Sequence, residues 1–341
     1  MASNNRIFYA CQAVIIMTLG KTPVVGGLVR GLQSVGMSSN FTLEQAFEMG
    51  QLSIYENIED VADIEVTLEK VIDGFPLIYT LASQGECRTT LSGASKKRCD
   101  IYLGLFDDGL DNASGVPRNV CFNSGMYTSS VSYSYSIDGN STESVTLVGN
   151  DRFWNADTGG SGPRPANLQW ASNLTGSILD GADLPASGIV RRNNVDINRS
   201  TLPTVIKSQV DHGNIVGNSA GLHIQSVSVS ADFGQENILE LGRFSPYTRY
   251  ATFPIEVTCE FEVMATSGDL VTVSGDGTNL SNNPITIVDD GGTNLNLGTK
   301  NKLSSVSYSG GDTGGGNATI SYSFSNFNDL LVHDSTGAAA N

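Results

Sequence analysis

Strict alternation of apolar and polar residues constrains this chain more than any other feature of its sequence. In Ile255–Val263 every second residue is apolar, and the residues between them are Glu256, Thr258, Glu260 and Glu262. Ile64–Leu68 follows the same pattern, with Glu65, Thr67 and Glu69 at the polar positions. Successive side chains of a β-strand point to opposite faces of its sheet. The pattern therefore predicts strands with one buried face and one acidic, solvated face.

The chain also repeats its own segments in a fixed order. LQSVGMSSNF (32–41) matches IQSVSVSADF (224–233), EQAFEMGQLS (44–53) matches ENILELGRFS (236–245), DIEVTLEKV (63–71) matches PIEVTCEFEV (254–263), IYLGLFDDG (101–109) matches ITIVDDGG (285–292), and SSVSYS occurs at both 129–134 and 304–309. Matches in one order indicate a duplicated unit. We expect the two copies to superpose, with Glu65 over Glu256 and Val131 over Val306.

The repeat divides the chain into an N-terminal strand or arm (1–26), a first unit (27–155), a linker or insertion (156–218), a second unit (219–335) and a C-terminal tail (336–341). The linker is rich in Gly, Pro and Asn, so we expect no core element in it. Asp138-Gly139 predicts a hairpin turn after SSVSYS. Phe41–Gly50 is expected to form one or two helical turns ending at Gly50, with Gly242 as its counterpart.

These patterns predict a mainly β fold class: two tandem duplicated β-sandwich or open-barrel domains, each with a short helix, joined by a long loop. Residues Ile7–Leu19 are mostly apolar and are expected to form a buried strand; a signal peptide is the alternative. The five cysteines are irregularly spaced, which favours reduced thiols over a disulfide framework. A net charge of −16 argues against partners bound by neutralising phosphates.

Candidate catalytic and metal-binding residues are few. GNSAG (217–221) fits a nucleophile elbow at Ser219, but the residues after it alternate like a strand, whereas the elbow requires a helix. His212, His223 and His333 lack metal-ligand spacing. The clusters Asp107-Asp108 and Asp289-Asp290 lack the full ligand series of a calcium loop. We therefore expect no enzyme activity, no cofactor and no metal, and a structural or adhesive role.

Two strings carry a family resemblance: LQSVGMSSNFTLEQAFEMGQLSIYENI (32–58) and IQSVSVSADFGQENILELGRFSPYTRYATFPIEVTCEFEV (224–263). They resemble the tail tube (major tail) proteins of tailed bacteriophages, of the duplicated-domain type. The resemblance implies stacked rings, four strands from each domain in a continuous barrel, and trimers with pseudo-sixfold symmetry. It also implies a virion protein assembled in the host cytoplasm. Its partners would be itself, the tape-measure, terminator and baseplate or tip proteins, and passing genomic DNA without specific binding, with no membrane.

For a tube protein the acidic face has a specific role. The apolar neighbours of Glu65, Thr67, Glu69, Glu256, Thr258, Glu260 and Glu262 are expected to be buried, so these seven side chains point the other way. We expect them to face the channel, where negative charge repels DNA phosphates. The same face could instead lie on the outside of the tube. A two-domain immunoglobulin-like adhesin that binds a receptor or carbohydrate is the rival function, and a hydrolase using Ser219 is a third.

Overall fold

The computed structural model describes residues 6–21, 23–83, 91–108, 113, 116–156, 188–197, 201–207, 223–274, 280–311 and 316–333. Within these ranges the fold is mainly β, as the alternation predicts, and its neighbouring strands are antiparallel. The described helices are α1 (Ile78–Ala82), α2 (Leu91–Ser95), α3 (Thr204–Lys207) and the 3₁₀ turns Tyr9–Cys11, Val25–Gly27 and Arg192–Asn194.

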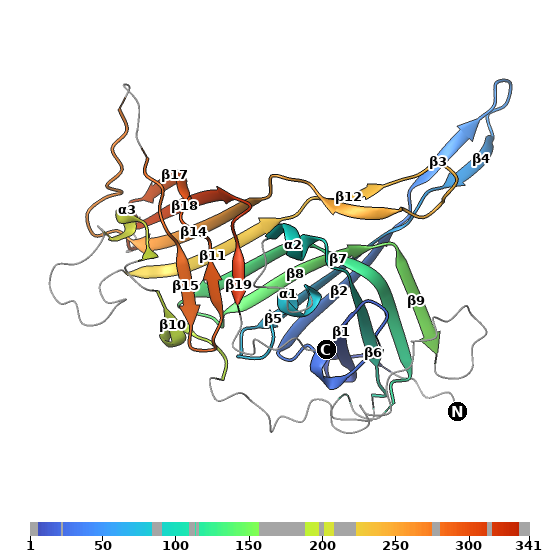
Figure 1. The fold of residues 1–341 in the computed structure, drawn as a ribbon, viewed down its shortest axis with the longest axis horizontal. Coiled ribbons are helices and arrows are strands. Elements are labelled where there is room, and N and C mark those ends of the chain that lie inside the picture. The colour runs from blue at the N-terminus through green and yellow to red at the C-terminus, as the bar shows by residue number, and fades with distance from the viewer. Residues whose placement is uncertain are drawn as a thin grey trace.

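One large sheet forms the body of the molecule (Figure 1). Eight of its strands follow one another side by side in the order β17 (Lys302–Ser309), β18 (Thr319–Phe327), β14 (Glu256–Met264), β11 (Ile224–Asp232), β7 (Asn119–Ser136), β8 (Thr142–Gly149), β5 (Asp63–Val71) and β2 (Leu32–Asn40). The second half of the chain supplies the first four of these strands, and the first half supplies the last four. Pairing between β11 and β7 joins the two sets into one sheet.

Both four-strand sets have the same internal order, because β17-β18-β14-β11 corresponds strand by strand to β7-β8-β5-β2. Their bulges also correspond. The β2–β5 register shifts between Leu32 and Ser34, and the β11–β14 register shifts between Ile224 and Ser226. The β7–β8 register shifts between Thr128 and Ser130, and the β17–β18 register between Leu303 and Ser305. A bulge adds a residue at one defined point, so it fixes the alignment of two otherwise similar strands.

This register corrects one expected superposition. Glu65 lies opposite Ser38, and Thr258 lies opposite Ser230, the residue that corresponds to Ser38. Glu65 therefore corresponds to Thr258 and not to Glu256. Because a strand repeats its side-chain direction every two residues, a two-residue shift preserves the pattern that suggested the alignment. For the other expected pair, Val131 comes two residues after the bulge of β7 and Val306 comes two residues after the bulge of β17, so these two residues correspond.

The N-terminal part of β7 belongs to a second branch of the sheet. There β7 pairs with β9 (Asp151–Ala156) on one side and β6 (Cys99–Leu105) on the other, and β6 pairs with β1 (Gln12–Thr18). The expected buried strand within Ile7–Leu19 is confirmed, since five central residues of β1 are buried. A small apolar cluster that includes Ile15, Tyr102 and Phe122 packs on one face of this branch.

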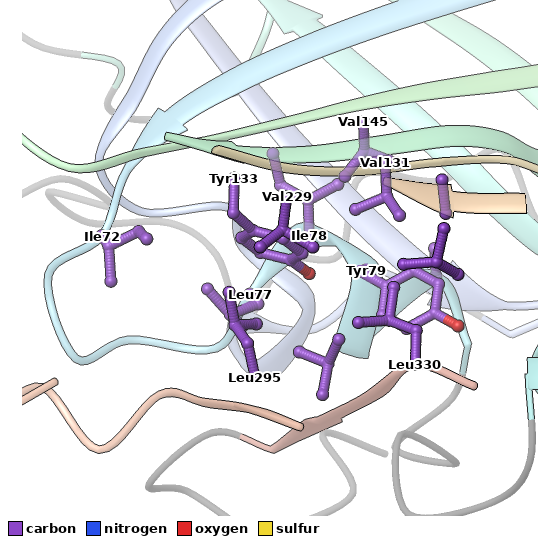
Figure 2. Packing of buried hydrophobic residues seen from close by; sticks show 14 of the residues in the cluster. Ile72, Leu77, Ile78, Tyr79, Val131, Tyr133, Val145, Val229, Leu295 and Leu330 are labelled. Carbon is purple, nitrogen blue, oxygen red and sulfur yellow. The ribbon is translucent and has the colours of Figure 1, made fainter. Parts of the chain in front are cut away.

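The main hydrophobic core lies on the apolar face of the eight strands. A four-stranded sheet of β10 (Val195–Asp196), β15 (Thr286–Asp289), β16 (Asn294–Asn296) and β19 (Leu331–His333) covers this face together with α1 and α2. Figure 2 shows Leu77, Tyr79, Leu295 and Leu330 packed below Tyr133 and Val229. Strands from both halves of the chain share this one core.

Two further expectations, one about the linker and one about a matched pair of strings, are wrong. The region 156–218 does supply core residues, because Val190, Leu202 and Ile206 are buried and β10 pairs with β15; Asp157–Ser187 lies outside the described residues. The matched strings 101–109 and 285–292 are not equivalent either. The first contributes to β6 and the second to β15, and these strands lie in different sheets.

Two hairpins extend from the same end of the large sheet (Figure 1). They are β3 (Leu43–Phe47) with β4 (Ile54–Glu59), and β12 (Gln235–Ile238) with β13 (Thr248–Ala251). The helix expected at Phe41–Gly50 is therefore wrong. The short helix expected in the second unit is wrong too, since no helix lies in the described part of 219–335, whereas the first unit contains α1 and α2. Isolated helices this short are unstable in water, and pairing with β4 satisfies the backbone. Gly50 and Gly242 have φ of 103° and 88° and occupy equivalent turns between paired strands.

Candidate functional surface

A continuous polar surface covers the face of the eight strands opposite the core. Registered cross-strand pairs connect Glu69, Ser144, Ser132, Ser230, Thr258 and Ser325 in one row from β5 to β18. A second row contains Thr142, Ser134, Ser228, Glu260, Ser323 and Ser305. Directly opposed residues point to the same side of a sheet. Small hydroxyl side chains and carboxylates therefore share this side, which we call the polar face.

All seven residues expected from the alternation lie on the polar face. Glu65, Glu256 and Glu260 are exposed, and Thr67, Glu69, Thr258 and Glu262 are half-buried. The residues between them, such as Val66, Leu68 and Phe261, are 0% exposed. The structure therefore brings both predicted clusters onto a single surface, with β8, β7 and β11 between β5 and β14. That this surface faces a channel remains a prediction.

Hydrogen bonds on the polar face recur in the two four-strand sets. Ser34 Oγ donates to Glu69 Oε2, and its counterpart Ser226 Oγ donates to Glu262 Oε2, both at 3.3 Å. The hydroxyl oxygens of Thr67 and Thr146 lie 3.4 Å apart. A serine hydroxyl that donates to a glutamate carboxylate on the neighbouring strand restricts the position of that glutamate side chain. The repeated bond thus keeps the acidic groups in the same place in both sets.

The polar face is strongly acidic. Its charged residues are Asp63, Glu65, Glu69, Asp232, Glu256, Glu260 and Glu262 with the single cation Lys302 at the edge of β17. The other basic residue of these eight strands, Lys70, is buried on the opposite face. At one end Asp63 Oδ1 accepts from Arg249 Nη2 at 2.5 Å, which attaches the β12–β13 hairpin to the first four-strand set. Glu65, Asp232, Glu256 and Glu260 are exposed to solvent.

The alternation in Ile255–Val263 and Ile64–Leu68 did not indicate that the serine strands belong to this surface. Ser130, Ser132 and Ser134 on β7 lie beside Ser226, Ser228 and Ser230 on β11. The signal was present in the repeated SSVSYS and in SVSVS (226–230), where serine occupies every second position. What the sequence lacked was the pairing of β7 with β11, which sets the two serine series side by side.

The two hairpins present large apolar side chains to solvent. Met49, Leu52 and Leu241 are fully exposed, and Phe47 and Phe244 are 64% and 68% exposed. A groove of about 480 Å³ between the hairpins is lined by Ile58 from β4, by Leu239, Leu241 and Phe244, and by charged residues of both hairpins. Exposed apolar side chains grouped in this way are common at surfaces that contact other proteins.

A buried ionic cluster lies below the polar face in the first half of the chain. Lys70 Nζ donates to Asp73 Oδ1 at 3.1 Å, and the carboxylate of Glu143, which is opposite Lys70 in the ladder, accepts from the backbone N–H groups of Ile78 and Tyr79. Desolvation raises the pKa of Glu143, although Lys70 and these donors oppose the shift. The second half has Val263 opposite Ile320 at the corresponding positions.

The catalytic and metal candidates do not come together in the described residues. Ser219 and His212 lie outside them, His223 is exposed, and His333 is half-buried in β19. Asp107 and Asp108 are exposed, whereas Asp289 is buried and accepts from Thr293 N and the Tyr135 hydroxyl. Across the described part of the chain no group of three or more His, Cys, Asp or Glu side chains is placed to hold a metal ion.

The four described cysteines, Cys11, Cys99, Cys121 and Cys259, are buried and form no disulfide with one another. Cys87 lies outside the described residues. Burial raises the pKa of the Cys121 thiol to about 11, although Arg152 and Asn123 lower it. The Cys121 thiol is therefore protonated at neutral pH. Among the described helices, none has the length and apolar character needed to cross a bilayer.

Comparison with known proteins gives only distant structural similarity. No protein-family model matches the chain, and no curated protein matches it. Among solved structures, a chain of the anti-feeding prophage baseplate matches 45% of this chain over 97% of its own length, with 12% identity and a TM-score of 0.32. A chain of the anti-feeding prophage tube-terminating cap matches 46% of this chain over 95% of its own length, with 15% identity and a TM-score of 0.34.

Proposed function

We propose that this chain is the structural subunit of a phage-type tail tube, in which stacked rings enclose a channel for DNA. The observation that carries the proposal is the polar face. It extends over eight strands and combines hydroxyl side chains with carboxylates, and its one cation lies at the edge. A surface of this composition neither neutralises phosphates nor offers guanidinium groups to bind them. DNA could therefore move along it without being held.

The two four-strand sets are, in this proposal, copies of one duplicated tube domain. Equal strand order, equivalent bulges and the recurring Ser–Glu hydrogen bond support the duplication. Three chains would then supply six sets, giving a homotrimeric ring with pseudo-sixfold symmetry. Closure into a ring leaves no open sheet edge.

The hairpins are the proposed contact between successive rings. The hairpins project beyond one end of the large sheet (Figure 1). They carry exposed apolar side chains, and a groove lies between them. A contact that joins one end of a subunit to the other end of the next is heterologous, so it propagates along a stack. At the ends of the stack the same surfaces would meet other tail proteins of the virion.

The immunoglobulin-like adhesin fits the fold less well. Tandem immunoglobulin-like domains would each pack two sheets around a separate core. Here β11 and β7 connect both halves in one sheet, and the main core contains residues from both.

The direct test is electron microscopy of the purified full-length protein. We expect hollow tubes of uniform diameter, and a three-dimensional reconstruction with Glu65, Glu69, Glu256, Glu260 and Glu262 at the inner radius. A protein that remains monomeric at high concentration would contradict the tube function. Tubes with these residues at the outer radius would contradict the channel assignment alone.

A further inference from the structure

The two outer strands of the eight-strand order have unprotected edges. In the described part of the chain, β2 pairs only with β5, and β17 pairs only with β18. β2 contains no charged residue and no proline, and β17 contains only Lys302, at its first position. Monomeric proteins usually protect such edges with charges, proline or a covering segment. These two edges are therefore suited to pairing with another strand.

An equivalent strand pairing already exists inside the chain. Inside the molecule β11 and β7 form an antiparallel ladder in which Val229 lies opposite Tyr133 and Ser230 opposite Ser132. By strand order and bulge position, β11 corresponds to β2, and β7 corresponds to β17. At the internal junction the counterpart of β2 is thus paired with the counterpart of β17. In the described part of the chain, the outer edges of β2 and β17 themselves have no partner.

Residues at the internal junction are more deeply buried than the corresponding residues of β2 and β17, as expected if these two edges lack a partner strand. Tyr133 and Val131 are each 1% exposed at the internal junction, whereas the corresponding Tyr308 is 54% exposed and Val306 is half-buried. On the other strand Val229 is 1% exposed, and the corresponding Met37 is half-buried. Apolar residues on both free edges would gain burial if the edges met.

We propose that β2 of one chain pairs antiparallel with β17 of a second copy of this chain, in the register of the internal junction. The pairs, with the β17 residue from the second copy, are Gly36 with Ser309, Met37 with Tyr308, Ser38 with Ser307, Ser39 with Val306, and Asn40 with Ser305. The inference rests on the proposed function, because it supplies the lateral contact of the ring, and it specifies that contact residue by residue.

The chemistry of the polar face fits this register. At the internal junction three of the pairs on the polar face are Ser–Ser pairs, the fourth pairs Asp232 with Ser130, and the glutamates lie on β5 and β14. In β2 the uncharged Asn40 corresponds to Asp232. The proposed junction likewise sets Ser38 against Ser307 and Gly36 against Ser309. Acidic side chains are therefore kept away from the junction between two acidic subunits, where like charges placed directly opposite would oppose pairing.

Cysteine pairs in the full chain test the register, in a background carrying Cys87→Ser. Directly opposite residues have Cα atoms within disulfide range, whereas pairs shifted by two residues are farther apart. After mild oxidation of assembled tubes, Ser38→Cys with Ser307→Cys should give covalently linked chains on a non-reducing gel. Ser38→Cys with Ser305→Cys should give at least tenfold less, and each single variant should give none.

A matched control lies within the chain. Ser230→Cys with Ser132→Cys copies the same geometry at the internal junction and should form an intramolecular disulfide, detected by peptide mapping, whether or not tubes form. If tubes form and the internal pair links but Ser38→Cys with Ser307→Cys does not, the proposed register is wrong. If no variant and no wild-type protein forms tubes, the proposed function fails instead.

Discussion

At the scale of single residues, the main difference between the two four-strand sets is the buried Lys70–Glu143 pair. Removing the Glu143 carboxylate leaves the buried N–H groups of Ile78 and Tyr79 without their acceptor, at a cost of about 1–3 kcal/mol for each unsatisfied group. We expect Glu143→Leu to lower the unfolding free energy by about 3 kcal/mol in urea titrations. Glu260→Leu, at an exposed position, should change it by less than about 0.5 kcal/mol. Equal effects would contradict a structural role for the pair.

The pH dependence of Glu143 has a definite sign. Desolvation raises its pKa in the folded state above the ordinary value of 4.5. The folded state therefore binds a proton more tightly than the unfolded state, and its stability falls as pH rises from 4.5 through the folded-state pKa. Relative to Glu143→Leu, the wild-type protein should lose unfolding free energy over this range. A difference that is constant with pH would show that Glu143 does not titrate as inferred.

At the scale of elements, the hairpins test the contact between rings. Met49, Leu52 and Leu241 are fully exposed, so replacing all three by serine should leave the melting temperature nearly unchanged. We expect the variant to form no long tubes, because the apolar contact area is lost. Val116→Ser with Val273→Ser, which changes exposed residues elsewhere, is the control. Tubes of wild-type length from the triple variant, measured by electron microscopy, would exclude the hairpin tips from stacking.

At the scale of the whole molecule, the acidic channel is tested by charge reversal. Replacing Glu256, Glu260 and Glu262 by lysine should leave tubes assembled, since these positions contact solvent or are half-buried. Tubes of the variant should bind double-stranded DNA in co-sedimentation assays, with affinity that falls as salt rises. Wild-type tubes should not. The control reverses Asp107, Asp108 and Asp138, which are exposed elsewhere. Equal DNA binding by both variants would contradict a channel location for the polar face.

The sequence by itself determined the strands and their two faces, because side-chain alternation is a local property with a period of two residues. It correctly indicated β5 and β14, the hairpin of β7 and β8, and the buried strand β1. It failed at Phe41–Gly50, where pairing with a strand later in the chain overrode the local preference. It also misaligned Glu65 with Glu256, because alternation does not distinguish registers two residues apart.

Only the tertiary structure decided how the two halves meet. The ladder between β7 and β11 turns two serine patterns and two glutamate clusters into one continuous surface, and it leaves β2 and β17 as open edges. Such pairing joins residues far apart in the chain and depends on which edges remain free after the local hairpins have formed. No period within either strand encodes that choice, since it is made by burial of the shared core.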